Sequence, residues 1–146
     1  MPKVLLVQGP NMAWLGKREP EIYGTTTAAE LDALLQEQAR GAGCELEIFY
    51  THIEGEAIGR IYEAVEGGTG GILMNPAGFS YAGYPLRDCL NAVTLPYVEV
   101  HISNVERRGI HSVLAGRADG VIFGFGIYSY VLGLQALLHL MAERAK

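Results

Sequence analysis

A charged loop that ends in a tyrosine stands near the start of the sequence. Residues 9–24 read GPNMAWLGKREPEIYG and directly follow the apolar run of residues 4–7. A tyrosine ordinarily ionises only at about pH 10, so Tyr23 can serve as a base at neutral pH only where a cation stabilises its phenolate form. Arg18 stands in the same loop and can supply that cation. From the spacing alone, an ordinary surface loop is the favoured interpretation.

An acidic residue and a histidine stand two positions apart at the end of a later apolar run. Side chains two positions apart in a strand point to the same side, so Glu99 can orient the imidazole of His101 and favour its protonated form. This pair is typical of a general acid. The backbone N–H groups of Ile102 and Ser103 follow directly and suit an anion. A purely structural histidine is the alternative.

Three further polar side chains directly follow apolar runs. Asn75 precedes the small residues 76–78, a good place to bind a carboxylate or a carbonyl, although a helix-capping asparagine fits the same pattern. Asn11 follows the first run and His52 the second, so both can reach the same cleft. The chain shows no metal-ligand spacing, no phosphate-binding loop and no G-x-S-x-G motif.

The composition indicates one globular domain that spans residues 1–146. Apolar residues make up 49% of the chain and charged residues 18%, which is typical of a folded protein. The net charge of −5, without runs of like charge, argues against nucleic acid as a partner, and no apolar stretch has the length of a membrane span. Cys44 and Cys89 show no motif spacing, so we expect two free thiols in a cytoplasmic protein.

Short apolar runs alternate with helical patterns along the chain. The expected strands are residues 3–8, 45–51, 71–75, 97–101 and 120–124. The expected helices are residues 27–40, 56–65, 84–92 and 128–145. This alternation predicts an α/β protein in which a five-stranded parallel sheet lies between two helix layers, with flavodoxin-like strand order. Functional residues should then cluster where the strands end.

Taken in order, these segments resemble the type II 3-dehydroquinate dehydratase family. The matching pieces are GPN at 9–11, REPEIYG at 18–24, EGE at 54–56, NPAGF at 75–79, LRD at 86–88, VEVHISN at 98–104 and GVIFGFG at 120–126. The resemblance implies a flavodoxin-like subunit and a trimer-based homododecamer. It also implies an anti elimination of water from a small carboxylate substrate, through an enolate and without metal or cofactor.

The resemblance also implies roles for the proton-handling residues. Tyr23 is expected to remove a proton beside the ketone, and Arg18 to assist its ionisation. Asn11 is expected to help stabilise the enolate. His101, held by Glu99, is expected to protonate the departing hydroxyl group.

Further positions match residues that the family uses to hold the substrate. The resemblance implies that Asn75 and the backbone of Ile102 and Ser103 take the substrate carboxylate. Asp88 matches an acid that the family contributes across a subunit interface.

The chain departs from the family pattern where the distal hydroxyl groups of the substrate would bind. Tyr81 stands where the family usually has a histidine, and Ala13 where it has a second loop asparagine. The segment after residue 104 is shortened, with Gly109 at the place of an arginine, so Arg107 or Arg108 would have to substitute. Lost polar partners change substrate discrimination.

Three functions are therefore open from the sequence. The first is a 3-dehydroquinate dehydratase with an atypical distal pocket. The second is a lyase of the same mechanism that acts on a different β-hydroxy ketone carboxylate. The third is a non-enzymatic homologue that binds a small acid, which an intact base and acid argue against.

Overall fold

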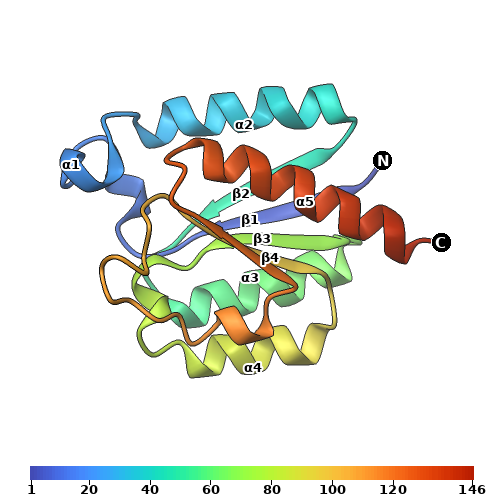
Figure 1. The fold of residues 1–146 in the computed structure, drawn as a ribbon. Coiled ribbons are helices and arrows are strands. Elements are labelled where there is room, and N and C mark those ends of the chain that lie inside the picture. Colours follow the sequence, from blue (N-terminus) through green and yellow to red (C-terminus); the bar gives the residue numbers. More distant parts are fainter.

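Five parallel strands form the centre of the structure, a computed structural model that describes residues 1–146 (Figure 1). The strands are β1 (Lys3–Gln8), β2 (Glu45–Tyr50), β3 (Gly71–Asn75), β4 (Tyr97–His101) and β5 (Gly120–Phe123). Their order in the sheet is β2-β1-β3-β4-β5, and every neighbouring pair is parallel. This order is flavodoxin-like and confirms the predicted fold class.

Helices cover both faces of the sheet. In Figure 1, α2 (Ala28–Ala42) and α5 (Tyr128–Arg144) lie above the sheet, and α3 (Glu54–Glu66) and α4 (Tyr84–Val93) lie below it. Short helical turns occupy the connections, namely η1 (Met12–Trp14), α1 (Pro20–Tyr23), η2 (Ala77–Ser80) and η3 (Ala115–Arg117). None of the helices combines the length and apolarity that a bilayer crossing requires.

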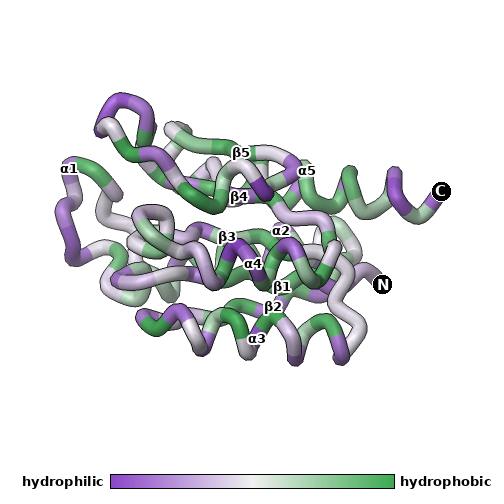
Figure 2. The backbone as a smooth tube through the Cα atoms, turned by 90° about the horizontal axis from the view of Figure 1, so that it is seen from below, coloured by the Kyte–Doolittle hydropathy of each residue, from purple (hydrophilic) through white to green (hydrophobic).

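The sheet separates two hydrophobic cores. Alternate side chains of β1 enter opposite cores, with Val4 and Leu6 on the side of α2 and α5 and Leu5 and Val7 on the side of α3 and α4. A strand that is buried on both faces reads as a continuous apolar run, which is why the sequence pattern located β1 and β3 so well. Figure 2 shows hydrophobic residues recurring along these central strands, whereas the segment beside α1 is hydrophilic.

Local sequence explains how the main helix of the upper layer begins and ends. Thr27 Oγ1 accepts from the Glu30 backbone N–H at 3.1 Å, and Glu30 Oε1 accepts from the Thr27 N–H at 3.0 Å, which forms a capping box. Gly43 ends α2 with a φ of 69°, a conformation that favours glycine.

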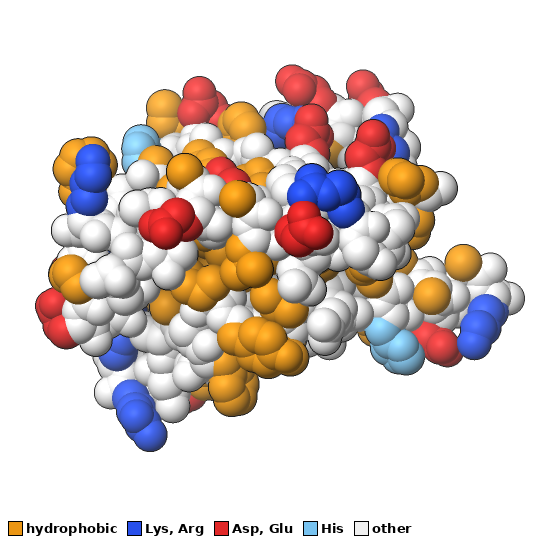
Figure 3. All heavy atoms as spheres, turned by 90° about the horizontal axis from the view of Figure 1, so that it is seen from above, with side chains coloured by type: hydrophobic (Ala, Val, Ile, Leu, Met, Phe, Trp, Pro, Cys, Tyr) orange, Lys and Arg blue, Asp and Glu red, His pale blue; other side chains and the backbone are white.

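Figure 3 views the molecule from the side of α2 and α5. Hydrophobic side chains gather in the middle of this face, and most charged side chains lie around them.

Candidate active site

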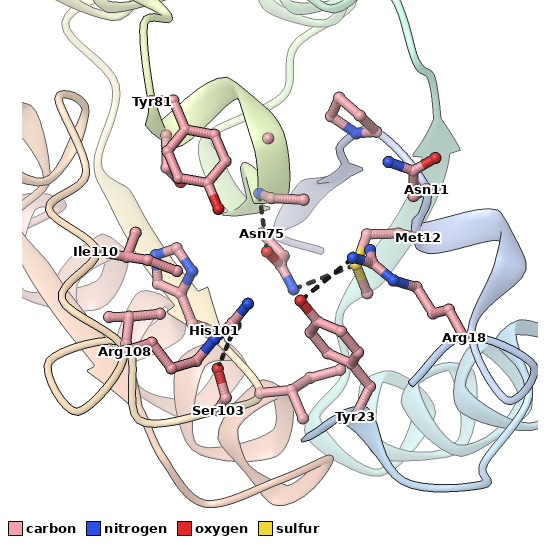
Figure 4. A pocket seen from close by; sticks show the side chains of 16 residues that line it. Asn11, Met12, Arg18, Tyr23, Asn75, Tyr81, His101, Ser103, Arg108 and Ile110 are labelled. Carbon is pink, nitrogen blue, oxygen red and sulfur yellow. Dashed lines mark hydrogen bonds between the residues drawn. The ribbon is translucent and has the colours of Figure 1, made fainter. Parts of the chain in front are cut away.

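A pocket opens where β1, β3 and β4 end (Figure 4). The predicted site residues that line it are Asn11, Arg18, Tyr23, Asn75, Tyr81, His101, Ile102, Ser103 and Arg108. The carboxyl ends of parallel strands meet at one edge of the sheet, so residues far apart in the sequence converge there. No three His, Cys, Asp or Glu side chains are grouped so that they could hold a metal ion.

Tyr23 lies at one side of the pocket, in contact with the guanidinium of Arg18. It ends the one-turn helix α1, and Arg18 Nη2 donates to its hydroxyl oxygen at 3.2 Å. The Arg18 guanidinium also lies 4.2 Å from the centre of the tyrosine ring, and that of Arg108 lies 5.5 Å from it. Two positive charges therefore lie close to the tyrosine ring, and one of them is hydrogen-bonded to its oxygen. The structure thus pairs Arg18 with Tyr23, a contact that the sequence spacing alone did not establish.

The loop after β1 is held tightly against the end of β3. The Gly9 N–H donates to the Asn75 carbonyl at 2.9 Å, and a Cβ on Gly9 would lie 2.3 Å from the Pro76 carbonyl oxygen, so only glycine fits. Asn11 follows with a φ of 70°, a left-handed conformation that asparagine tolerates. Its N–H donates to Nδ1 of His52 at 3.0 Å. His52 does not line the pocket, as the sequence suggested it could, but contacts the loop from outside.

His101 and Glu99 form a hydrogen-bonded pair on β4, on the other side of the pocket from Tyr23 (Figure 4). His101 Nε2 lies 2.8 Å from Glu99 Oε2, and the carboxylate is completely buried. Glu99 Oε1 accepts from the Tyr97 hydroxyl at 2.6 Å and from Ser112 Oγ at 3.2 Å. Burial raises the pKa of Tyr97, and the neighbouring carboxylate adds to this, so the phenol stays protonated and donates. With Nε2 engaged, Nδ1 is the imidazole nitrogen left for a ligand.

Two of these partners were absent from the sequence prediction. Tyr97 stands two positions before Glu99, so the strand period that paired Glu99 with His101 also places Tyr97 on that side. Ser112 belongs to the loop after β4, and no local pattern connects it with Glu99.

Asn75 lies at the floor of the pocket and is almost fully buried. Its Nδ2 donates to the Tyr130 hydroxyl at 2.8 Å and makes a long contact of 3.7 Å with Met12 Sδ. Its Oδ1 accepts from the Ala77 N–H at 3.0 Å. Tyr130 in turn donates to Gln8 Oε1 at 2.8 Å. The carboxamide therefore has a defined orientation before any ligand binds.

Arg108 and Tyr81 lie at the rim of the pocket, in the two segments that flank the expected distal end of the substrate. Arg108 turns inward and donates from Nη1 to Ser103 Oγ at 2.9 Å, whereas Arg107 does not line the pocket. Gly109 follows with a φ of 69°, which turns the chain directly after the inward arginine. Tyr81 lines the opposite part of the rim and is 62% exposed.

Asp88 and Ala13, which the sequence also singled out, do not line this pocket either. Asp88 lies on α4 with its side chain exposed. Ala13 lines a separate shallow pocket together with His52.

Comparisons with known proteins show the family of the chain. The sequence model described as dehydroquinase class II matches residues 2–138. A 3-dehydroquinate dehydratase from Xanthomonas oryzae pv. oryzae is 47% identical over 141 residues, which cover 94% of this chain and 95% of the relative. The type II dehydroquinase of Butyrivibrio crossotus superimposes with a TM-score of 0.89 at 36% identity, covering 94% of this chain and 97% of that one. The enzyme from Propionibacterium acnes gives a TM-score of 0.88 at 37% identity, with 97% of each chain covered. The chain belongs to the class II dehydroquinase family.

Proposed function

We propose that the protein is a 3-dehydroquinate dehydratase, which removes water from 3-dehydroquinate to form 3-dehydroshikimate through an enolate. The observation that carries this proposal is that Tyr23, bonded to Arg18, and His101, bonded to the buried Glu99, line opposite sides of one pocket. The relative from Xanthomonas oryzae pv. oryzae and its homologues bear that name. These names favour neither a lyase that acts on a different β-hydroxy ketone carboxylate nor a non-enzymatic protein.

Proton abstraction is the task of Tyr23. Its phenolate, stabilised by Arg18, removes a proton from the carbon beside the ketone, and the ketone oxygen becomes an enolate oxygen. Asn11 at the mouth of the pocket helps to stabilise that charge.

Departure of the hydroxyl group is the task of His101. A protonated imidazole donates from Nδ1, because Nε2 is bonded to Glu99. The Glu99 carboxylate stabilises the positive charge of the imidazolium. The hydroxyl groups of Tyr97 and Ser112, which donate to the other carboxylate oxygen, hold Glu99 in position. The base ends α1 and the acid ends β4, on opposite sides of the pocket. This placement suits an anti elimination, in which the proton and the hydroxyl leave opposite faces of the ring.

The substrate carboxylate is assigned to Asn75 and to the backbone N–H groups of Ile102 and Ser103. Arg108 takes the place of the family arginine that is missing at Gly109 and contacts the distal hydroxyl groups of the substrate. This role is supported by its inward direction and by its hydrogen bond to Ser103.

The proposed assembly is a cytoplasmic, trimer-based dodecamer of single-domain subunits. This proposal is supported by the position of Asp88, whose side chain is exposed and does not line the pocket of the same subunit. An acid placed in this way can contribute to catalysis only in the pocket of a neighbouring subunit.

The direct test is incubation of the purified protein with 3-dehydroquinate while the enone absorbance of 3-dehydroshikimate is followed. We expect steady turnover, and we expect Tyr23→Phe to abolish most of it, because phenylalanine keeps the ring but has no oxygen to accept the proton. Tyr62→Phe is the matched control, since Tyr62 lies on α3, 43% exposed and outside the pocket. Folded parent protein without turnover would refute the proposal. A parent with slow turnover that Tyr81→His accelerates would show that the rim tyrosine limits this substrate.

A further inference from the structure

A buried chain of three side chains lies beneath the pocket floor and has no part in the proton transfers. Gln8 ends β1 and Asn75 ends β3, and the two residues are direct partners in the register of these strands. Tyr130, from the first turn of α5, lies between them and bonds to both. Gln8 and Tyr130 are fully buried.

We propose that Tyr130, itself oriented by Gln8, is a positioning residue that holds the Asn75 carboxamide with an N–H group toward the substrate carboxylate. The inference rests on the proposed function, because it assigns the carboxylate to Asn75. It concerns how strongly the substrate is bound, and it adds no group that touches the reacting atoms.

The direction of the chain follows from the groups that cannot reverse. The Ala77 backbone N–H can only donate, so the Asn75 oxygen faces it at 3.0 Å and the Asn75 nitrogen faces Tyr130 at 2.8 Å. The Tyr130 oxygen therefore accepts from Asn75, and its single hydrogen goes to Gln8 Oε1 at 2.8 Å. Burial raises the pKa of Tyr130, so this hydrogen is retained.

The second hydrogen of Asn75 Nδ2 has a poor partner in the protein. It points to Met12 Sδ at 3.7 Å, and thioether sulfur is a weak acceptor. Met12 and Asn75 both line the pocket (Figure 4). A carboxylate oxygen is a far better acceptor, so the bound substrate can take this hydrogen while Tyr130 keeps the other one. A rotated carboxamide would instead present its oxygen to the anion and repel it.

The test uses Tyr130→Phe, which keeps the ring and removes only the hydroxyl group. The Asn75 nitrogen then loses its strong acceptor, and the Ala77 N–H is the only strong hydrogen bond that still orients the carboxamide. We expect KM for 3-dehydroquinate to rise roughly tenfold, with kcat changed less than about threefold, because a carboxylate contact acts equally in the ground state and the transition state. Gln8→Met should change KM in the same direction, because it frees the tyrosine hydrogen to turn toward Asn75.

The decisive comparison is made in an Asn75→Ala background. If Tyr130 acts through Asn75, removing its hydroxyl group there should leave KM unchanged. An equal rise of KM in both backgrounds, or no rise in Tyr130→Phe, would overturn the inference. Gln8→Met carries the test if Tyr130→Phe does not fold, and Tyr62→Phe again serves as the control.

Measuring the affinity for 3-dehydroshikimate by calorimetry tests this inference independently of the proposed function. It needs no turnover, and the product still bears the carboxylate. A parent that binds the product about tenfold more tightly than Tyr130→Phe supports the inference even if the parent is inactive. Equal binding by the two proteins overturns the inference even if the parent is active.

Discussion

Replacing Glu99 by glutamine should disable the acid while leaving the shape of the site intact. Both hydroxyl donors, Tyr97 and Ser112, bond to the same carboxylate oxygen, so the glutamine oxygen is expected to occupy that position. The amide NH₂ then faces His101 Nε2, which must accept. The only proton of the ring moves to Nδ1, and His101 becomes a neutral imidazole, a far weaker acid than the imidazolium it replaces.

The size of the effect follows from the role of a general acid. A positioned acid contributes roughly 10²- to 10⁴-fold to the rate, which corresponds to about 3–5 kcal/mol of transition-state stabilisation. Glutamine retains the two hydroxyl contacts and a hydrogen bond to the ring, so we expect kcat to fall by roughly 10²- to 10³-fold.

Steady-state turnover of 3-dehydroquinate is the measurement, with circular dichroism as the check on folding. Tyr97→Phe is the matched control, because it removes one hydrogen bond but keeps the charge of Glu99. We expect that control to change kcat less than about tenfold. A Glu99→Gln enzyme within about threefold of the parent would refute the assignment of Glu99–His101 as the acid pair.

Three further predictions concern the loop after β1, the start of α2 and the two thiols. His52→Ala removes the acceptor of the Asn11 N–H and should lower kcat about three- to tenfold, whereas His52→Asn keeps an acceptor in place of Nδ1 and should stay within about twofold in the same assay. Thr27→Ala breaks the capping box and should lower the free energy of unfolding by about 1 kcal/mol in a urea titration, and an unchanged midpoint would contradict this. Burial raises the pKa of the Cys44 and Cys89 thiols, so both should react slowly with iodoacetamide at neutral pH in the folded protein and quickly in denaturant.

The strands were predictable because burial on both faces leaves an apolar run with sharp ends. β1, β3 and β4 match their predicted bounds, and β2 and β5 each end one residue early. The sequence pattern predicted the start of α3 two residues too late, because no residue of the usual capping types precedes the helix. Its N-cap is Ile53, without a side-chain hydrogen bond.

The site was predictable where its geometry is local. The period of a strand places Glu99 beside His101, and a single helical turn closes the loop between Arg18 and Tyr23. The choice between two consecutive arginines was not predictable, because it depends on how the backbone turns at Gly109.

Tertiary contacts were beyond any local pattern. Tyr130 stands 55 positions from Asn75, and only the packing of α5 on the sheet brings them together. The hydrogen bond between His52 and Asn11 likewise spans 41 positions.

The close approach of Gly9 to Pro76 limits where new substrate range can arise in this protein. A Cβ on Gly9 would lie 2.3 Å from the Pro76 carbonyl oxygen, so any larger residue there would displace the strand ends that carry the pocket floor. The exposed Tyr81 and the short turn at Arg108 face no such barrier. A mutant library meant to change which acid is dehydrated should therefore vary the entrance and leave the base of the cavity untouched.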